Sequence, residues 1–297
     1  MGRAIRIGQL GCGIVGSATL RMLHANASDI EERCGATLEV VAVAVRSLAK
    51  ERDVPPGTEA LLTTDPHEVV RHPDVDVIVE AMGGIEPTRT LLLEAIANGK
   101  HVVTANKELL ASLGQELFDA AEAKGVDLYY EAAVAGGIPL IRPLKESLAG
   151  ERIRKVMGIV NGTTNFILTK MADDGLEFGE ALAEAERLGY TELDPTADIE
   201  GFDPAAKTAI LASIAFNARV VSGDVYREGI AGITASDISF ARRLGYTVKL
   251  LAIAEEQDGE IAVRVHPAMI PSTHPLASVR DNLNAVFVEG ELSLIHI

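Results

Sequence analysis

The chain has 297 residues, of which 47% are apolar and 24% charged, a composition typical of a soluble globular protein with material for two domains. Its formal net charge of −16 excludes a broad surface for nucleic acid or anionic membranes, because both need clustered lysine and arginine. Cys12 and Cys34 are too few for a disulfide framework, and no run of about 18 apolar residues predicts a membrane span. We therefore expect a reduced cytoplasmic protein with neither a nucleic-acid nor a membrane partner.

The first predicted elements are a strand, a glycine-rich turn and a helix. Residues 4–10 form a short apolar run, residues 11–16 read GCGIVG, and a helical pattern follows over residues 17–25. Glycines in a GxGxxG turn permit the close approach of a pyrophosphate, and the following helix offers it free N–H groups. The pattern predicts a dinucleotide site, with a purely structural turn as the alternative. The predicted contacts are Gly11, Gly13, Ile14, Val15 and Gly16.

Strands and helices alternate through the rest of the first half. Predicted strands cover residues 38–45, 75–81, 101–104 and 126–131, and the clearest helices cover residues 87–98 and 107–124. Strands separated by helices pair in parallel through right-handed crossovers. For residues 1–135 we therefore predict an α/β fold with a doubly wound parallel sheet of the Rossmann type.

The end of the second predicted strand bears on the choice of cofactor. An acid there binds the ribose 2′-hydroxyl of NAD, whereas an arginine accommodates the 2′-phosphate of NADP. This strand ends in Val45-Arg46-Ser47, with Lys50 close behind and no acid at the tip. Arg46 and Lys50 therefore favour NADP, with NAD as the second candidate and an ordinary surface arginine as the alternative interpretation.

The pattern changes at residue 136, and we predict a second, α+β domain over residues 136–297. A helix is expected over residues 139–148, a strand over 152–160, and a helix over 166–171 that opens on Asn161-Gly162-Thr163-Thr164-Asn165. Small polar groups at such a junction cap the helix, and they can also bind a polar ligand. A further helix over residues 177–188 ends at Gly189, a natural position for glycine.

An acidic loop follows, GYTELDPTADIEGFDPAAK at residues 189–207, with five carboxylates, two prolines and one lysine. It is a poor strand and a poor helix, and a solvated surface loop is the simplest interpretation. Asp203-Pro204 predicts the N-cap and first residue of another helix. On that helix Lys207 shares the apolar face of Ile210, Leu211 and Ile214. Such a lysine can serve as a general acid or base if Asp203 keeps it charged. Alternatively, its side chain can extend beyond the apolar face so that the amine reaches solvent.

Residues 247–256 and 261–267 predict two further strands, joined by a turn at Asp258-Gly259. An antiparallel pair of this kind has an edge that needs covering. We therefore expect a hairpin that belongs to a larger sheet in the second domain.

Several segments together match a known family. The chain resembles homoserine dehydrogenase in GCGIVG at 11–16, VTANKELLA at 103–111, YEAAVAGGIPLI at 130–141, NGTTNFIL at 161–168 and LGYTELDPTADIEGFDPAAK at 188–207. They occur in the family's order and with its spacing over nearly the whole chain. The resemblance implies reversible, NAD(P)-dependent oxidation of L-homoserine to L-aspartate 4-semialdehyde, a step towards threonine and methionine.

The resemblance also implies roles for single residues. Lys207 matches the catalytic lysine, Glu192 the position that binds the homoserine ammonium, and Asp198 and Asp203 the acids that shape the same pocket. Lys107 matches a lysine beside the nicotinamide and the substrate. The family binds a sodium ion, largely through backbone carbonyls, at positions that match Glu131, Val134, Gly136 and Ile138. The predicted hairpin would belong to the sheet through which members form homodimers.

The last residues, ELSLIHI at 291–297, depart from the family. Members normally continue into a glycine-rich segment and a helix that returns to the nucleotide-binding domain, and many then carry a regulatory ACT domain. We therefore expect a C-terminally incomplete member without an ACT domain. The alternatives are another two-domain oxidoreductase acting on an amino acid or a sugar, and a non-catalytic NADP-binding protein.

Overall fold

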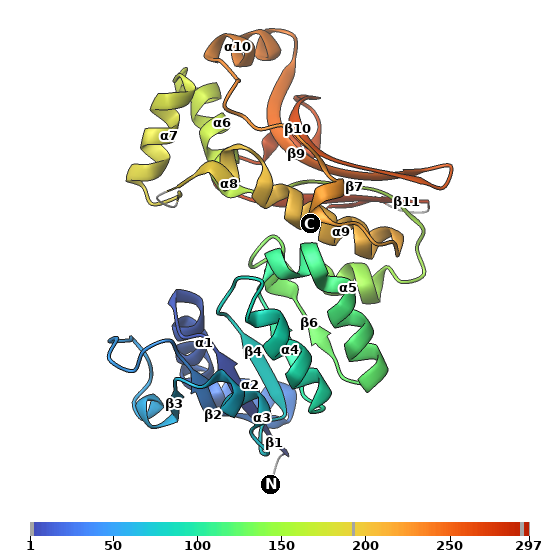
Figure 1. The fold of residues 1–297 in the computed structure, drawn as a ribbon. Coiled ribbons are helices and arrows are strands. Elements are labelled where there is room, and N and C mark those ends of the chain that lie inside the picture. The colour runs from blue at the N-terminus through green and yellow to red at the C-terminus, as the bar shows by residue number, and fades with distance from the viewer. Residues whose placement is uncertain (1–2, 192–193, 292–293, 297) are drawn as a thin grey trace. The chain divides into compact units, whose positions relative to one another are not determined.

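The structure is a computed structural model that describes residues 3–191, 194–291 and 294–296. It divides into two compact units, Met1–Ala133 and Val134–Ile297, which Figure 1 shows in blue to green and in green to red. Among the described residues, no helix is both long enough and apolar enough to cross a membrane.

The first unit is built on a parallel six-stranded sheet. The strands lie in the order β3-β2-β1-β4-β5-β6, and every neighbouring pair is parallel. The order therefore reverses between β1 and β4, as in a doubly wound fold. The predicted fold class is confirmed. The strands are β1 (Arg3–Leu10), β2 (Ala36–Ala44), β3 (Leu62–Thr63), β4 (Val77–Glu80), β5 (His101–Thr104) and β6 (Leu128–Tyr129).

The helices of this unit connect the parallel strands and bury apolar side chains. They are α1 (Ile14–Ala25), α2 (Ala27–Cys34), α3 (Pro66–Arg71), α4 (Thr88–Ala97) and α5 (Lys107–Lys124). Leu91 and Leu92 of α4 and Leu109 and Leu117 of α5 are fully buried, as is Ile78 of β4. Burial of such side chains is the main source of stability in the sheet–helix layers. The helix predicted over residues 107–124 agrees with the observed bounds of α5, whereas β3 was not predicted and no bounds were predicted for α2 and α3.

The second unit contains a mixed six-stranded sheet in the order β12-β11-β7-β9-β10-β8. The pairs are antiparallel except for β8 with β10. The turn between β9 and β10 has positive φ at both Asp258 and Gly259, so the predicted hairpin is confirmed. The strands are β7 (Ile153–Ile159), β8 (Tyr226–Arg227), β9 (Tyr246–Gln257), β10 (Glu260–Pro271), β11 (Ala285–Gly290) and β12 (Leu294–His296).

The helices of the second unit are α6 (Gly162–Asp174), α7 (Phe178–Arg187), α8 (Thr196–Ile199), α9 (Phe202–Phe216) and α10 (Ala235–Arg243). Helix α9 packs against β7, β9 and β10 (Figure 1). Its buried residues include Ala205, Ala209 and Leu211, whose small or branched side chains allow close contact with the sheet. Helix α6 packs against α7 and β9, so the polar run that opens α6 is held against the core of the unit.

Three predictions for this unit are corrected by the structure. The helix predicted over residues 139–148 is shorter than predicted: residues 141–142 are α-helical and lead into a short π-helix, η3 (Pro143–Ser147), because the Leu148 N–H bonds to the carbonyl oxygen of Pro143, five residues back. The acidic loop is not wholly irregular, since it contains α8. Asp203 is not the N-cap of α9: the helix begins at Phe202, after Gly201 with a φ of 79°. Asp203 instead lies within the first turn, and its side chain accepts hydrogen bonds from Asn161 and Lys207.

Candidate active site

The glycine-rich turn between β1 and α1 is shaped by backbone contacts. Gly11 has a φ of 95°, and a Cβ there would lie 2.7 Å from the carbonyl oxygen of Ala81. A Cβ on Gly16 would lie 2.3 Å from the carbonyl oxygen of Gly11. At Gly13, by contrast, a Cβ would meet no atom of the described residues within 4 Å. The backbone of the turn is therefore packed against other protein atoms at Gly11 and Gly16, and at Gly13 there is open space beside it.

The N-terminus of α1 beside Gly13 is also open. Ile14 is 92% exposed and Val15 is exposed too, and the described residues provide no side-chain cap and no acid in the first turn. Its N–H groups and the positive end of its dipole are thus available to an anion. The turn lies where the strand order reverses, the position at which doubly wound sheets bind nucleotides. The residues present therefore fit the predicted dinucleotide.

Gln9 holds both ends of this turn and was not predicted from the sequence. Its side chain is fully buried at the end of β1, and Nε2 donates to the carbonyl oxygens of Gly11, at 2.8 Å, and Gly16, at 3.2 Å. Two hydrogen bonds from one buried amide fix the shape of the turn before any ligand binds. Gln9 lies within the apolar run of β1, so the sequence pattern gave no sign of this role.

Lys107 is the first residue of α5, and a buried network fixes the start of that helix. Glu80, at the carboxyl end of β4, accepts from the backbone N–H groups of Met82 and Gly83 and from the hydroxyl of Thr104, at 2.8, 2.9 and 2.5 Å. The Thr104 hydroxyl accepts from Asn106 N at 3.0 Å, and Asn106 caps α5 by accepting from Leu109 N at 3.1 Å. The strand end at Glu80 thus holds the segment that carries Lys107, a link that the sequence pattern did not reveal.

Arg46 and Lys50 lie on an exposed loop that follows β2. The guanidinium of Arg52 donates to the carbonyl oxygens of Ser47, at 2.7 Å, and Lys50, at 2.6 Å, and so closes the loop on itself. In the described part of the chain, neither Arg46 nor Lys50 forms an ion pair with an acid. The loop therefore presents two cations at the place where the predicted 2′-phosphate would bind.

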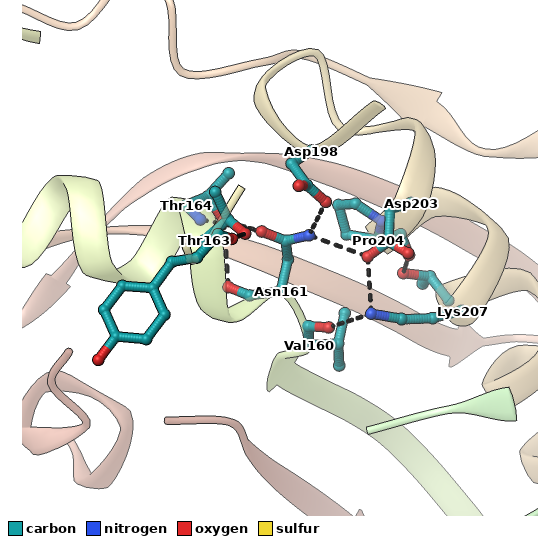
Figure 2. A network of polar contacts seen from close by, with 10 residues as sticks. Val160, Asn161, Thr163, Thr164, Asp198, Asp203, Pro204 and Lys207 are labelled. Carbon is teal, nitrogen blue, oxygen red and sulfur yellow. Dashed lines mark hydrogen bonds and ion pairs between the residues drawn. The ribbon is translucent and has the colours of Figure 1, made fainter. Parts of the chain in front are cut away.

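In the second unit, Asn161 joins two aspartates of the acidic segment (Figure 2). It caps α6, because its Oδ1 accepts from Thr164 N at 2.9 Å. Its Nδ2 donates to Oδ1 of Asp198 at 2.6 Å and to Oδ2 of Asp203 at 2.9 Å. The polar run Asn161–Asn165, predicted to cap a helix and to bind a polar ligand, thus contacts the acidic segment directly.

Lys207 completes this cluster. Its Nζ donates to Oδ2 of Asp203 at 2.6 Å and to the carbonyl oxygen of Val160 at 2.8 Å. The side chain of Lys207 is 15% exposed and that of Asp203 is buried, so the amine ends on protein oxygens instead of reaching into solvent. An ion pair with so little contact with water is screened far less than a surface pair. Figure 2 shows the chain of contacts from Asp198 through Asn161 and Asp203 to Lys207.

The beginning of the acidic loop is fastened to the same helix. Thr163 Oγ1 donates to the carbonyl oxygen of Tyr190 at 2.7 Å, and the Tyr190 ring packs on Phe166 with centroids 4.9 Å apart. Tyr190 near the start of the loop and Asp198 near its middle are thus held by Thr163 of α6 and by its N-cap Asn161. Glu192, the predicted ammonium ligand, falls between them in the sequence and is outside the described residues.

The residues predicted to bind sodium lie close together in sequence. Glu131 begins the 3₁₀ helix Glu131–Ala133, Val134 is fully buried, Gly136 is exposed and Ile138 is half-buried. Within the described residues, no group of three or more histidines, cysteines, aspartates or glutamates could hold a metal ion. A site made chiefly of backbone carbonyls does not need such a group, because alkali and alkaline-earth ions take oxygen ligands of any kind.

Comparison with known proteins decides the family. Residues 11–131 match the family model of the homoserine dehydrogenase NAD-binding domain, and residues 139–294 match that of homoserine dehydrogenase itself. The chain belongs to the homoserine dehydrogenase family. Every described residue of the cluster around Asn161 lies within the second match, and the glycine-rich turn opens the first.

Relatives and solved structures agree with this family assignment. The chain is 52% identical to homoserine dehydrogenase of Corynebacterium glutamicum over 98% of its length, and 51% identical to that of Mycobacterium tuberculosis over 97%. It spans 66% of the length of each of these curated relatives. The crystal structure of a homoserine dehydrogenase from Thiobacillus denitrificans matches with a TM-score of 0.92 and 48% identity, over 99% of this chain and 69% of that one. A hyperthermophilic archaeal homoserine dehydrogenase, solved in complex with NADPH, matches with a TM-score of 0.81 and 27% identity over 99% of this chain and 90% of that one.

Proposed function

We propose that the chain catalyses the reversible oxidation of L-homoserine to L-aspartate 4-semialdehyde with NADP, in the route to threonine and methionine. The observation that carries this proposal is the buried Asp203–Lys207 pair, joined to Asp198 by Asn161 in a chain of the homoserine dehydrogenase family. Hydride transfer needs no protein nucleophile, so the protein's task is to orient the substrate and to move one proton.

The cofactor would be held by the first unit. Gly11, Gly13, Ile14, Val15 and Gly16 would receive its pyrophosphate, and Arg46 and Lys50 its 2′-phosphate, with NAD as the weaker alternative. When bound, the cofactor would supply the acceptor for the hydride of the homoserine alcohol carbon. Lys107, held at the start of α5 by the network from Glu80, would act beside the cofactor and the substrate.

Lys207 would exchange the proton of the substrate hydroxyl. In the oxidation, its neutral amine takes the proton from the hydroxyl, and in the reduction its ammonium returns that proton to the aldehyde oxygen. The oxygens of Asp203 and Val160 stabilise the ammonium that forms, because both accept hydrogen bonds from Nζ. The homoserine ammonium needs an acid, and Asp198 and Glu192 would supply it.

The remaining parts of the proposal rest on the family. A sodium ion would be held near Glu131, Val134, Gly136 and Ile138, and two copies of the chain would associate through the sheet of the second unit. The protein would work in the cytoplasm. Sedimentation of the purified protein tests the dimer, and the dependence of turnover on Na⁺ against choline tests the ion.

The central experiment is NADP-dependent oxidation of L-homoserine by the purified chain at alkaline pH, followed as absorbance of NADPH. Lys207→Ala should abolish turnover and leave the Kd of NADPH unchanged, because the cofactor site lies in the first unit. Lys170→Ala is the matched control, since Lys170 also pairs with an aspartate four residues away on a helix of the second unit. Turnover in Lys207→Ala near that of the control would remove Lys207 from the mechanism. A folded wild-type chain that binds NADPH without oxidising homoserine would overturn the proposed activity and favour a cofactor-binding protein.

A further inference from the structure

Asn161 is buried between two chemically different sets of partners. The residue is 5% exposed, and its Oδ1 accepts from both the backbone N–H and the hydroxyl of Thr164, each at 2.9 Å. Its Nδ2 donates to Asp198 and Asp203. These partners fix which end of the amide is nitrogen, because an ionised carboxylate only accepts and a backbone N–H only donates.

A single NH₂ group therefore supplies one hydrogen to each of two carboxylates. Asp198 comes from α8 and Asp203 from α9, and Asn161 stands at the N-terminus of α6, so three helices meet at this amide. Oδ2 of Asp203 is shared, since it accepts from Asn161 and from Lys207. The position of the Lys207 amine relative to Asp198 is consequently fixed through Asn161.

We propose that Asn161 is a positioning residue for the reaction: its two N–H groups hold the carboxylate that faces the substrate ammonium at a set distance from the amine that exchanges the proton. This inference rests on the proposed function for the roles of Asp198 and Lys207. Homoserine carries its ammonium and its hydroxyl on the same short chain, so the spacing of the two protein groups decides whether the hydroxyl reaches Lys207.

Helix capping alone is the competing explanation, and two substitutions distinguish it from a role in joining Asp198 to Asp203. Asparagine, aspartate and serine are nearly equal as N-caps. Asn161→Asp keeps the acceptor for Thr164 but turns an oxygen towards two carboxylates. Asn161→Ser keeps a capping oxygen and removes both amide hydrogens. If Asn161 only caps α6, the wild type, Asn161→Ser and Asn161→Asp should behave alike. If Asn161 also joins Asp198 to Asp203, Asn161→Ser should be impaired and Asn161→Asp more so.

The first measurement is steady-state oxidation of homoserine together with the Kd of NADPH. We expect kcat/KM for homoserine to fall roughly tenfold in Asn161→Ser and roughly a hundredfold in Asn161→Asp, because hydrogen bonds to charged groups are lost in the first and replaced by repulsion in the second. The Kd of NADPH should stay within about twofold of wild type. Equal kcat/KM in the three proteins would overturn the inference. A parallel loss of NADPH binding would mean general unfolding and would overturn it too.

The second measurement does not depend on turnover, so it separates this inference from the proposed function. Thermal unfolding near pH 7 should show a Tm for Asn161→Asp lower by roughly 5 °C or more, and for Asn161→Ser a smaller loss. Asp65, which caps α3 by accepting from His67 N at 2.8 Å, provides the control. Asp65→Asn should change Tm by about 1 °C or less. If Asn161→Asp is as stable as wild type, Asn161 is only a cap, whether or not the chain oxidises homoserine.

Discussion

Alanine substitutions at two glycines of the GxGxxG turn should distinguish a loss of stability from a loss of cofactor binding. A Cβ at Gly16 would lie 2.3 Å from the carbonyl oxygen of Gly11, whereas a Cβ at Gly13 would meet no described atom within 4 Å. Gly16→Ala should therefore strain the free protein. Gly13→Ala should leave the free protein unchanged and obstruct only the pyrophosphate that approaches the turn.

The size of each effect follows from these contacts. In Gly16→Ala the turn must move by about 1 Å to restore van der Waals contact, and overpacking of this kind costs about 1–3 kcal/mol. Alanine in a helix gains about 1 kcal/mol over glycine, so the upper end of this range leaves a net loss of about 2 kcal/mol. A net loss of that size lowers the Tm by roughly 4–8 °C. In Gly13→Ala the poorer N-cap costs about 0.5–1 kcal/mol, which the reduced entropy of the unfolded chain offsets by about the same amount.

Thermal unfolding by circular dichroism and titration of NADPH by fluorescence test this pair of substitutions. Gly13→Ala should keep the wild-type Tm within about 2 °C and weaken NADPH binding at least tenfold, about 1.4 kcal/mol. Gly16→Ala should lose Tm and affinity together. Wild-type affinity for NADPH in Gly13→Ala would refute the assignment of the turn to the pyrophosphate, and an unchanged Tm in Gly16→Ala would refute the contact with Gly11.

Three further results are expected. Burial lowers the pKa of the Lys249 amine from 10.5 to about 8, so the folded protein loses this proton at a lower pH than the unfolded chain does. The free energy of unfolding should therefore rise by a few kcal/mol as pH increases from about 8 to 10.5. Urea unfolding should show this rise in the wild type, and Lys249→Met should lack it. Arg46→Ala should raise the KM for NADP roughly tenfold and leave that for NAD unchanged; equal effects on both would remove Arg46 from the 2′-phosphate site. Glu192→Gln should raise the KM for homoserine with little change in kcat, and an unaltered homoserine dependence in initial rates would contradict its role.

The role proposed for the cluster of the second unit has a simple physical basis. A lysine that exchanges a proton must have a partner that stabilises its charged form without fixing it there. Asp203 and the carbonyl of Val160 accept hydrogen bonds from the Lys207 amine, and Asn161 joins the pair to Asp198. In the proposed reaction, the acidic segment would therefore combine substrate binding and proton transfer within a few residues of the start of α9.

The sequence by itself determined the features that depend on neighbouring residues. The glycine spacing at 11–16, the alternation of strands and helices, the bounds of α5 and the turn at Asp258-Gly259 all follow from local sterics and from the hydrophobic period. The family followed from motifs in a fixed order. For the same reason the short β3 was missed, because a two-residue strand has no period.

The tertiary structure alone decided which polar groups meet. Asn161 is 37 residues from Asp198 and 42 from Asp203, and Glu80 is 24 from Thr104. Contacts over such separations depend on how helices and strands pack, and a hydrophobic period carries no information about them. Asp203 shows the difference most clearly. Local rules place it at a helix cap, but Gly201 turns the chain earlier, and the buried carboxylate instead binds Asn161 and Lys207.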